Sequence, residues 1–397
     1  MFFFVALAVF ASAYGYVGWR IIGTAQLAHP WNLLAWIALL SMIFLPFVPL
    51  IGRRFGRESA ILDGLAWIGY TGLGLFSLVF AALLARDALW LVTLAGAKIG
   101  SWISGGTDAL ADPVRRRFIV NGLNLGILGG AAVLSGYGFF SSRGPLRIQQ
   151  ISVAIPGLPK ALDGLRIAQV TDVHVGPTIK RDYVQRIVDK VNAIGADIIA
   201  FTGDLVDGSV ESLGNDVAPM AQMKAPLGKF FVTGNHEYYS GVDQWVEEAE
   251  RLGYRVLLNE HVPIEKDGAS LILAGVTDYR AETIKPEHKS SVKKAIEAAP
   301  DNTVKILLAH QPKSVFEASE LGIDLVLSGH THGGQYVPWT YLVGLDQPYV
   351  KGLHNHNGTH IYVSNGAGYW GPPLRLQAPP EIAVITLRSG EAQTSSS

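Results

Sequence analysis

The chain has 397 residues, which is enough for two domains that each bury a hydrophobic core. Hydrophobic residues make up 49% and charged residues 16%, and the mean hydropathy of +0.26 is higher than an ordinary soluble protein shows, which predicts membrane segments. The net charge of −1 gives no sign of nucleic-acid binding, and the lack of cysteine excludes disulfides, thiolate metal ligands and cysteine nucleophiles.

The apolar residues are concentrated before about residue 140, in stretches of nearly the length that crosses a bilayer as a helix. Four long stretches carry no charge, and their succession argues against buried helices of a soluble core. A fifth stretch is short and contains Lys98. The four are residues 2–19, 31–52, 65–85 and 118–140, and the fifth is 88–103. We therefore predict a multi-helix transmembrane region of four or five helices.

Two arginine clusters set the expected orientation, because basic residues that flank membrane helices stay in the cytoplasm. One cluster lies within residues 53–57 and the other at residues 115–117. Both stay inside if Arg86-Asp87 forms an outside turn and residues 88–103 also cross, which makes five crossings. We then expect a multi-pass protein of the cytoplasmic membrane with its C-terminal half outside. If residues 88–103 do not cross, the two clusters fall on opposite sides of the membrane, against this rule, and the C-terminal half lies in the cytoplasm.

From about Arg147 the composition changes, and short runs of strand-forming residues alternate with helical patterns. Such alternation is typical of an α/β domain. The predicted strands cover residues 165–170, 197–201, 229–232, 271–274, 304–308 and 324–327. The expected organisation is a transmembrane region over residues 1–141, a linker and first strand over 142–164, an α/β domain over 165–388, and a disordered polar tail over 389–397.

Five short polar motifs each follow a predicted strand. In α/β sheets the carboxyl ends of the strands are where ligands bind, so the motifs are expected to meet in one crevice. Taken singly, each has an ordinary explanation as a turn, a helix cap or a core histidine. Together they predict one site. They are Asp172-Val173-His174, Gly203-Asp204, Gly234-Asn235-His236-Glu237, Ala309-His310 and Gly329-His330-Thr331-His332.

The residue types in these motifs point to a pair of divalent metal ions. Asp, Asn and His supply oxygen and nitrogen donors without sulfur, which suits Mn, Fe or Zn and suits Mg less well. Two ions held about 3.5–4 Å apart need a carboxylate between them, and an aspartate on a tight Gly-Asp turn can reach both. Such a pair lowers the pKa of a bridging water and clamps phosphoryl oxygens.

The five motifs resemble those of the calcineurin-like metallophosphoesterase superfamily, over residues 165–387. The resemblance implies a four-layer αββα sandwich of two mixed sheets. It also implies a phosphoric ester or anhydride hydrolase with two divalent ions, of which Mn is the first expectation and Fe, Zn or Mg the alternatives. A phosphorylated small molecule or lipid is the expected substrate, and the sequence does not specify an oligomeric state.

The resemblance also assigns roles by motif position. His236 would protonate or stabilise the leaving group, and Glu237 would orient His236 or a metal ligand. Asp204 would bridge the two ions. The remaining ligands would be Asp172, His174 and His332 for one ion, and Asn235, His310 and His330 for the other.

The apolar first part resembles the transmembrane members of the superfamily, several of which are grouped with enzymes that cleave UDP-2,3-diacylglucosamine in lipid A synthesis. That substrate is cytoplasmic, which conflicts with a C-terminal half outside the membrane. Residues 363–382 also resemble this subgroup. Within them, Arg375 would hold a substrate phosphate or serve as a supporting structural residue.

Two other classes of function remain to be compared. A catalytically silent membrane receptor or scaffold would have no need of seven metal ligands and an acid. A transporter would be expected to carry more charges inside its membrane helices, where Asp63 and Lys98 are the main ones. The sequence therefore favours a membrane-anchored metal-dependent phosphohydrolase.

Overall fold

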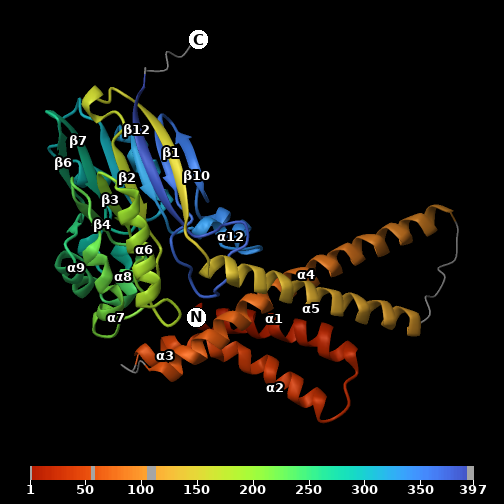
Figure 1. The fold of residues 1–397 in the computed structure, drawn as a ribbon. Helices are drawn as coiled ribbons and strands as arrows, with labels where there is room; N and C mark the ends of the chain where they lie inside the picture. The colour runs from red at the N-terminus through yellow and green to blue at the C-terminus, as the bar shows by residue number, and fades with distance from the viewer. Residues whose placement is uncertain (1, 55–58, 105–112, 391–397) are drawn as a thin grey trace. The chain divides into compact units, whose positions relative to one another are not determined.

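The computed structural model describes residues 2–54, 59–104 and 113–390 (Figure 1). The chain divides into two compact units. The first consists of residues 1–140 together with 371–374, and the second of residues 141–370 together with 375–397.

The first unit is helical. Two of its described helices are long and apolar enough to cross a membrane, over Ala60–Ile103 and Val114–Arg143, and the apolar stretch Trp31–Phe47 is shorter. The prediction of five crossings is therefore not confirmed. The helices are α1 (Phe2–Ala25), α2 (Trp31–Phe44), η1 (Leu45–Phe47), α3 (Val48–Arg54), α4 (Ala60–Ser104) and α5 (Pro113–Arg143), the last of which ends in the second unit.

The predicted turn at Arg86-Asp87 is wrong, because α4 continues through both residues without a break. Neither residue interrupts a helix as proline would. Their charges also have partners inside the first unit: Asp87 accepts a hydrogen bond of 2.7 Å from Tyr16 and lies 2.5 Å from the guanidinium of Arg20. Residues 65–103 thus belong to a single helix.

The second unit contains two six-stranded mixed sheets, which confirms that part of the predicted fold. One sheet has the strand order β1-β12-β2-β3-β4-β5 and the other β10-β11-β9-β8-β7-β6. Each combines parallel and antiparallel pairs. The strands are β1 (Arg147–Pro156), β2 (Arg166–Val170), β3 (Ile198–Thr202), β4 (Lys229–Val232), β5 (Arg255–Val256), β6 (Glu260–Lys266), β7 (Ala269–Gly275), β8 (Lys305–Leu308), β9 (Leu325–Ser328), β10 (Gly352–His356), β11 (Thr359–Val363) and β12 (Glu381–Gly390).

Helices cover the outer face of each sheet. The α-helices are α6 (Arg181–Ile194), α7 (Val210–Val217), α8 (Asn235–Ser240), α9 (Val242–Arg251), α10 (Val292–Ala295), α11 (Val315–Glu320) and α12 (Trp339–Asp346). Short 3-10 helices are η2 (Lys160–Leu162), η3 (Ala218–Gln222), η4 (Ala281–Thr283), η5 (Pro286–His288), η6 (Pro312–Ser314) and η7 (His332–Gly334).

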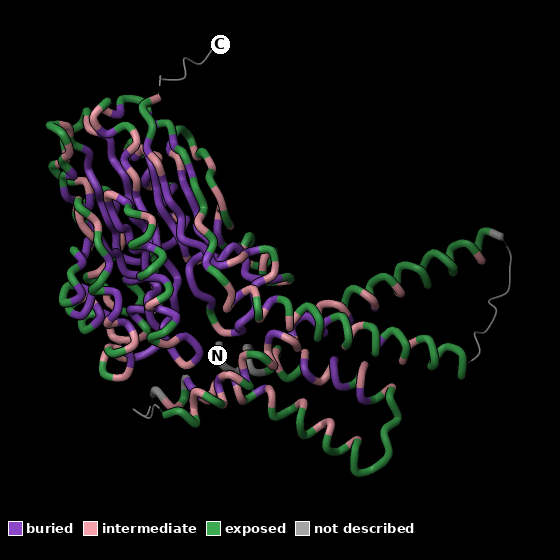
Figure 2. The backbone as a smooth tube through the Cα atoms, viewed as in Figure 1, coloured by how far each residue is buried: buried purple, intermediate pink, exposed green. Residues whose placement is uncertain are grey.

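Three buried clusters hold these layers together (Figure 2). Alternate residues of one strand point to opposite faces, so Ala168 and Val170 of β2 pack under α6 while Ile167 faces the second sheet. On the far face of that sheet, Leu307 of β8 packs against Val315 of α11. Helix, sheet, sheet and helix therefore follow one another as the resemblance implied.

All six strands predicted from buried apolar runs are present, as β2, β3, β4, β7, β8 and β9. The edge strand β10 gave a weaker signal, because none of its residues is fully buried. Ser389 and Gly390 end β12, so the predicted disordered tail does not begin at residue 389. The rest of that prediction falls on residues 391–397, outside the described residues.

Candidate metal centre

The five polar motifs all lie at the carboxyl ends of strands. Three follow β2, β3 and β4 of one sheet, and two follow β8 and β9 of the other. Since these strands are parallel within each sheet, their carboxyl ends share one edge. Both sheets therefore contribute side chains to the same edge of the second unit.

Several of the motif residues adopt a left-handed backbone conformation. The φ angles are 55° at Asp172, 53° at His174, 56° at Asp204, 70° at His330 and 52° at His332. A non-glycine residue pays on the order of 1–3 kcal/mol for such a conformation, and it persists only where the surroundings enforce it. Here the turn sends each side chain back across the strand end, toward the other motifs.

One group of donor atoms consists of Asp172, His174 and His332, all buried. The Nε2 atoms of His174 and His332 lie 3.0 Å apart, and Asp172 Oδ1 is 3.5 Å from His332 Nε2. Two imidazole nitrogens and a carboxylate oxygen that converge in a buried space match the donor set of a divalent cation.

A second group consists of Asp204, His310 and His330. His310 Nε2 lies 3.0 Å from Asp204 Oδ2 and 3.2 Å from His330 Nδ1. The same Asp204 oxygen is 3.7 Å from His174 Nε2 of the first group. One carboxylate thus faces both groups, as the predicted bridging ligand should.

Asn235, the remaining predicted ligand, begins α8. Its Oδ1 is buried and has no hydrogen-bond partner among the described residues. A buried amide oxygen without a partner is costly, and a cation would satisfy it. The next residue connects this position to the second group, because the backbone N–H of His236 donates to Asp204 Oδ1 at 2.9 Å. These observations fit two divalent cations.

Polar contacts from outside the two groups orient the donors. Asp172 accepts hydrogen bonds from the Thr171 hydroxyl at 2.7 Å and from the His330 backbone N–H at 3.0 Å. His310 Nδ1 lies 2.8 Å from the carbonyl oxygen of Thr202. That carbonyl can only accept, so Nδ1 carries the proton and Nε2 stays free as a donor to metal.

Glu237 joins two of the motifs through their backbones. Its buried carboxylate accepts hydrogen bonds from the N–H groups of Gly234 at 2.7 Å, Asp204 at 2.9 Å and Leu205 at 2.8 Å. Burial, together with the negative charge of Asp204, raises the pKa of Glu237 to about 7. Of its two expected roles, these contacts support the orientation of the ligand Asp204.

The sequence analysis missed Asp207. Its carboxylate accepts a hydrogen bond from Nδ1 of His236 and lies 3.3 Å from Nδ1 of His174. Burial lowers the pKa of His236, but the carboxylates of Asp207 and Asp204 outweigh it and raise that pKa to about 9. The two carboxylates thus favour the protonated form of His236. The signal in the sequence was that Asp207 follows Asp204 by three residues, but nothing in the local sequence distinguishes Asp207 from an ordinary turn residue.

Arg375 lies against the first group, and none of its surface is exposed. Its guanidinium donates to the carbonyl oxygens of His332 at 2.7 Å and Ala378 at 3.2 Å, and lies 3.0 Å from His332 Nδ1. A further bond from Nε reaches the carbonyl oxygen of Gly368 at 3.1 Å. These contacts correspond to the supporting role. A guanidinium with no exposed surface does not reach a substrate phosphate.

Two exposed aromatic rings flank His236. The ring centroid of Tyr239 is 5.3 Å away and that of Trp370 5.7 Å away, and the two residues are 64% and 55% exposed. Both rings are therefore available beside His236 for contact with a bound molecule.

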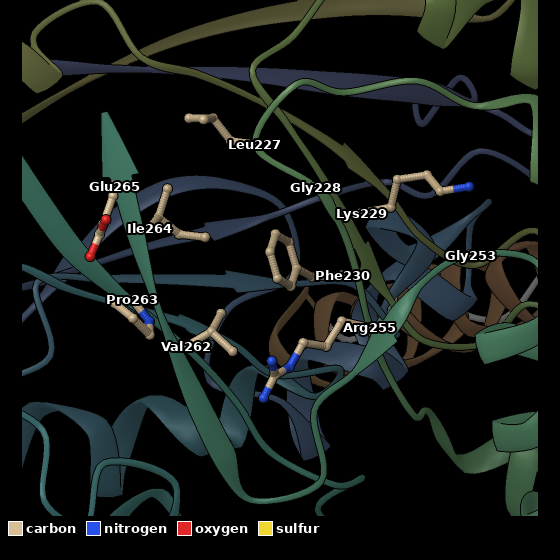
Figure 3. Close-up of a pocket in the computed structure, with 10 residues that line it drawn as sticks. All are labelled: Leu227, Gly228, Lys229, Phe230, Gly253, Arg255, Val262, Pro263, Ile264 and Glu265. Carbon is tan, nitrogen blue, oxygen red and sulfur yellow. The ribbon is translucent and has the colours of Figure 1, made fainter. Parts of the chain in front are cut away.

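A separate surface hollow lies elsewhere in the second unit (Figure 3). The residues that line it lie near the amino end of β4 and along β6, and none of them belongs to the five motifs. Its charged side chains are Lys229, Arg255 and Glu265. The hollow therefore belongs to the opposite ends of the strands and takes no part in the metal centre.

Comparisons with known proteins agree with this geometry. A family model described as calcineurin-like phosphoesterase matches residues 165–334. An uncharacterized metallophosphoesterase of Helicobacter pylori (strain ATCC 700392 / 26695) is 40% identical over 281 residues, which cover 69% of this chain and 72% of that protein.

Two vertebrate relatives are each named a transmembrane protein with metallophosphoesterase domain. The one from Danio rerio is 38% identical over 265 residues, which span 65% of this chain and 61% of that protein, less than two thirds of its length. The one from Bos taurus is 32% identical over 382 residues, which span 94% of this chain and 81% of that protein.

Replacing the shared carboxylate tests the metal centre. We expect purified protein to hold about two transition-metal ions per chain, and Asp204→Ala to lose both, since one side chain serves both ions. Elemental analysis after loading with Mn measures the ratio. Asp197→Ala is the matched control, because Asp197 accepts a hydrogen bond from the Arg166 backbone at the amino end of β3. Unchanged metal content in Asp204→Ala would exclude the assignment.

The acid function of His236 is tested through the leaving group. His236→Ala should keep both metal ions and lose turnover by about 10²–10⁴-fold. The loss should shrink for a p-nitrophenyl ester, whose leaving group needs no proton. Asp207→Asn should show the same dependence on leaving group with a smaller loss, because it acts through His236. Loss of metal in His236→Ala would show instead that this residue is a ligand.

Proposed function

Because the chain belongs to the calcineurin-like phosphoesterase family, we propose that it is a membrane-anchored, dinuclear-metal phosphohydrolase that cleaves a phosphoester or pyrophosphate bond. The observation that carries the proposal is the position of Asp204, whose Oδ2 lies 3.0 Å from His310 and 3.7 Å from His174. A carboxylate shared between two donor groups is what a two-metal hydrolase requires.

Seven side chains would hold the two ions. When bound, the ions supply Lewis acidity and a hydroxide at neutral pH. The oxygen and nitrogen donors suit Mn first, with Fe, Zn or Mg as alternatives. Asp204 would serve both ions, Asp172, His174 and His332 the first, and Asn235, His310 and His330 the second.

His236 would supply the proton to the leaving group. Its Nδ1 donates to Asp207, which leaves Nε2 as the atom that can deliver a proton elsewhere. Asp207 also faces Nδ1 of His174, so one carboxylate orients both the acid and a metal ligand. Glu237 holds the backbone of Asp204, and Arg375 holds that of His332.

A membrane anchor is supported by the two apolar helices and by the names of the vertebrate relatives. The second unit begins at the end of α5, since β1 starts only four residues after Arg143. A substrate that is itself held in the membrane fits this attachment. We therefore propose a lipid-linked phosphate or a nucleotide-sugar lipid, of which a UDP-2,3-diacylglucosamine-type molecule is one candidate.

A hydrolysis assay tests the proposed activity. Detergent-solubilised protein loaded with Mn should hydrolyse at least one member of a panel of phosphomonoesters, phosphodiesters, nucleotide-sugars and lipid pyrophosphates. The rate should fall to background in Asp204→Ala, which loses both ions. Protein that holds two ions per chain and still turns over nothing in the panel would favour the receptor or scaffold alternative.

The length of α4 bears on the side of the membrane on which the second unit lies. The spanning stretch of 44 residues is ~66 Å long at 1.5 Å per residue, and a straight helix crosses a ~30 Å hydrocarbon core only once. With α5 as the second crossing, the second unit lies on the same side as the arginines of residues 53–57. The arginines of residues 115–117 then lie on the opposite side, so the positive-inside rule does not by itself choose between the two sides. We propose the cytoplasmic side for the second unit, because a nucleotide-sugar lipid is a cytoplasmic substrate.

Reporter fusions at the C-terminus check this orientation. A reporter that folds only in the cytoplasm should be active, and one that folds only outside should be silent. A variant with glutamine in place of the arginines of residues 53–57 is the matched control, because it should weaken the preference for the cytoplasmic side. The opposite reporter pattern would place the second unit outside and remove cytoplasmic nucleotide-sugars from the substrates.

A further inference from the structure

Helix α12 exposes an apolar surface that a soluble domain would bury. None of its residues is buried, and its first seven residues carry no charge. Tyr341 is 72% exposed, Leu342 48% and Leu345 85%, and Trp339 at its start is 41% exposed. A surface helix of a globular protein normally turns its apolar stripe to the core. Contiguous exposed apolar residues instead indicate a surface that meets a partner or a membrane.

The helix is fixed to the metal centre. It begins seven residues after the ligand His332, and Gln335 between them is held at both ends of its amide. The Gln335 side chain donates to the carbonyl oxygen of Trp370 at 3.1 Å and accepts from the Trp370 backbone N–H at 3.1 Å. At the other end of α12, Asp346 pairs with Lys313 at 2.7 Å and Arg280 at 3.1 Å. The apolar turns between these anchors are therefore held in place.

The same contacts connect α12 with the end of the apolar helix α5. Tyr369, which precedes Trp370, lies with its hydroxyl 3.3 Å from the guanidinium of Arg143, the last residue of α5. Arg143 also donates to the carbonyl oxygen of Thr178 at 2.8 Å. The start of α12, the exposed ring of Trp370 and the end of α5 thus belong to one connected region of the second unit.

We propose that α12 inserts into the headgroup region of the bilayer that α5 crosses, beside the opening of the metal centre. Leucine and valine favour the acyl boundary, and the amphipathic rings of Trp339 and Tyr341 favour the interface itself. The uncharged turns also suit the acyl boundary, which charged side chains would enter at a high free-energy cost. This inference rests on the proposed membrane anchoring. An inserted α12 would bring a membrane-borne phosphoester next to the metal centre.

The lack of cysteine makes a direct test possible, because a single introduced cysteine is the only thiol in the chain. We would label Leu345→Cys and, as a second α12 position, Leu342→Cys with an environment-sensitive fluorophore in the full chain, reconstituted in phosphatidylcholine–phosphatidylglycerol nanodiscs. Val133→Cys on α5 is the control for the proposed span, and it is 72% exposed. Ser270→Cys is the control for water, since Ser270 is exposed near the amino end of β7.

A lipid carrying a quencher on its acyl chain should reduce the fluorescence at both α12 positions about threefold more than at Ser270→Cys, and iodide should do the reverse. If Val133→Cys is quenched by lipid while the α12 labels behave like Ser270→Cys, α12 lies in water and the inference is wrong. If lipid does not quench Val133→Cys, the anchoring itself is wrong, and the inference fails with it.

Shielding of the α12 labels from both quenchers would show that a protein surface covers the helix, and would also overturn the inference. None of these fluorescence measurements requires the protein to hydrolyse a substrate. A failed hydrolysis assay with lipid-quenched α12 labels would therefore contradict the proposed activity alone.

Discussion

The main physical constraint on the second unit is the free-energy cost of burying two aspartates and four histidines within a few ångströms of one another. Desolvation disfavours their charged forms, and no single pattern of protonation relieves all of them. Burial raises the pKa of Asp172, while the imidazole of His310 holds that of Asp204 well below its usual range against the effect of burial. Burial lowers the pKa of His330 to about 3. Divalent cations compensate such a set of donors, because they replace the lost water and supply positive charge.

Backbone strain at the donor residues is a second free-energy cost. It is offset by buried side chains that hydrogen-bond to the backbone of the donors. Three of the five motifs turn through left-handed residues, and such turns last only if neighbouring bonds enforce them. Glu237 fixes the backbone of Asp204, and Arg375 fixes that of His332. Both are fully buried, and both act on residues more than thirty positions away in the sequence.

Exposed apolar side chains lie beside the metal centre. Trp370 and Tyr239 border His236, and α12 follows the last metal ligand within one short loop. An exposed apolar rim beside a polar catalytic centre fits an amphiphilic substrate, because the phosphate and the apolar part then meet different surfaces. The attachment of this region to the end of α5 is consistent with that arrangement.

The sequence by itself determined six of the eight central strands and the seven metal-ligand candidates, because buried strands and the motifs that follow them are local patterns. It did not determine the role of Asp207 or Arg375, since each depends on a partner brought near only by folding. The unbroken course of α4 was also decided by tertiary contacts, in which Tyr16 and Arg20 supply partners for Asp87. The exposure of α12 has the same origin: its leucines resemble core residues in sequence, and only the packing of the finished domain leaves them at the surface.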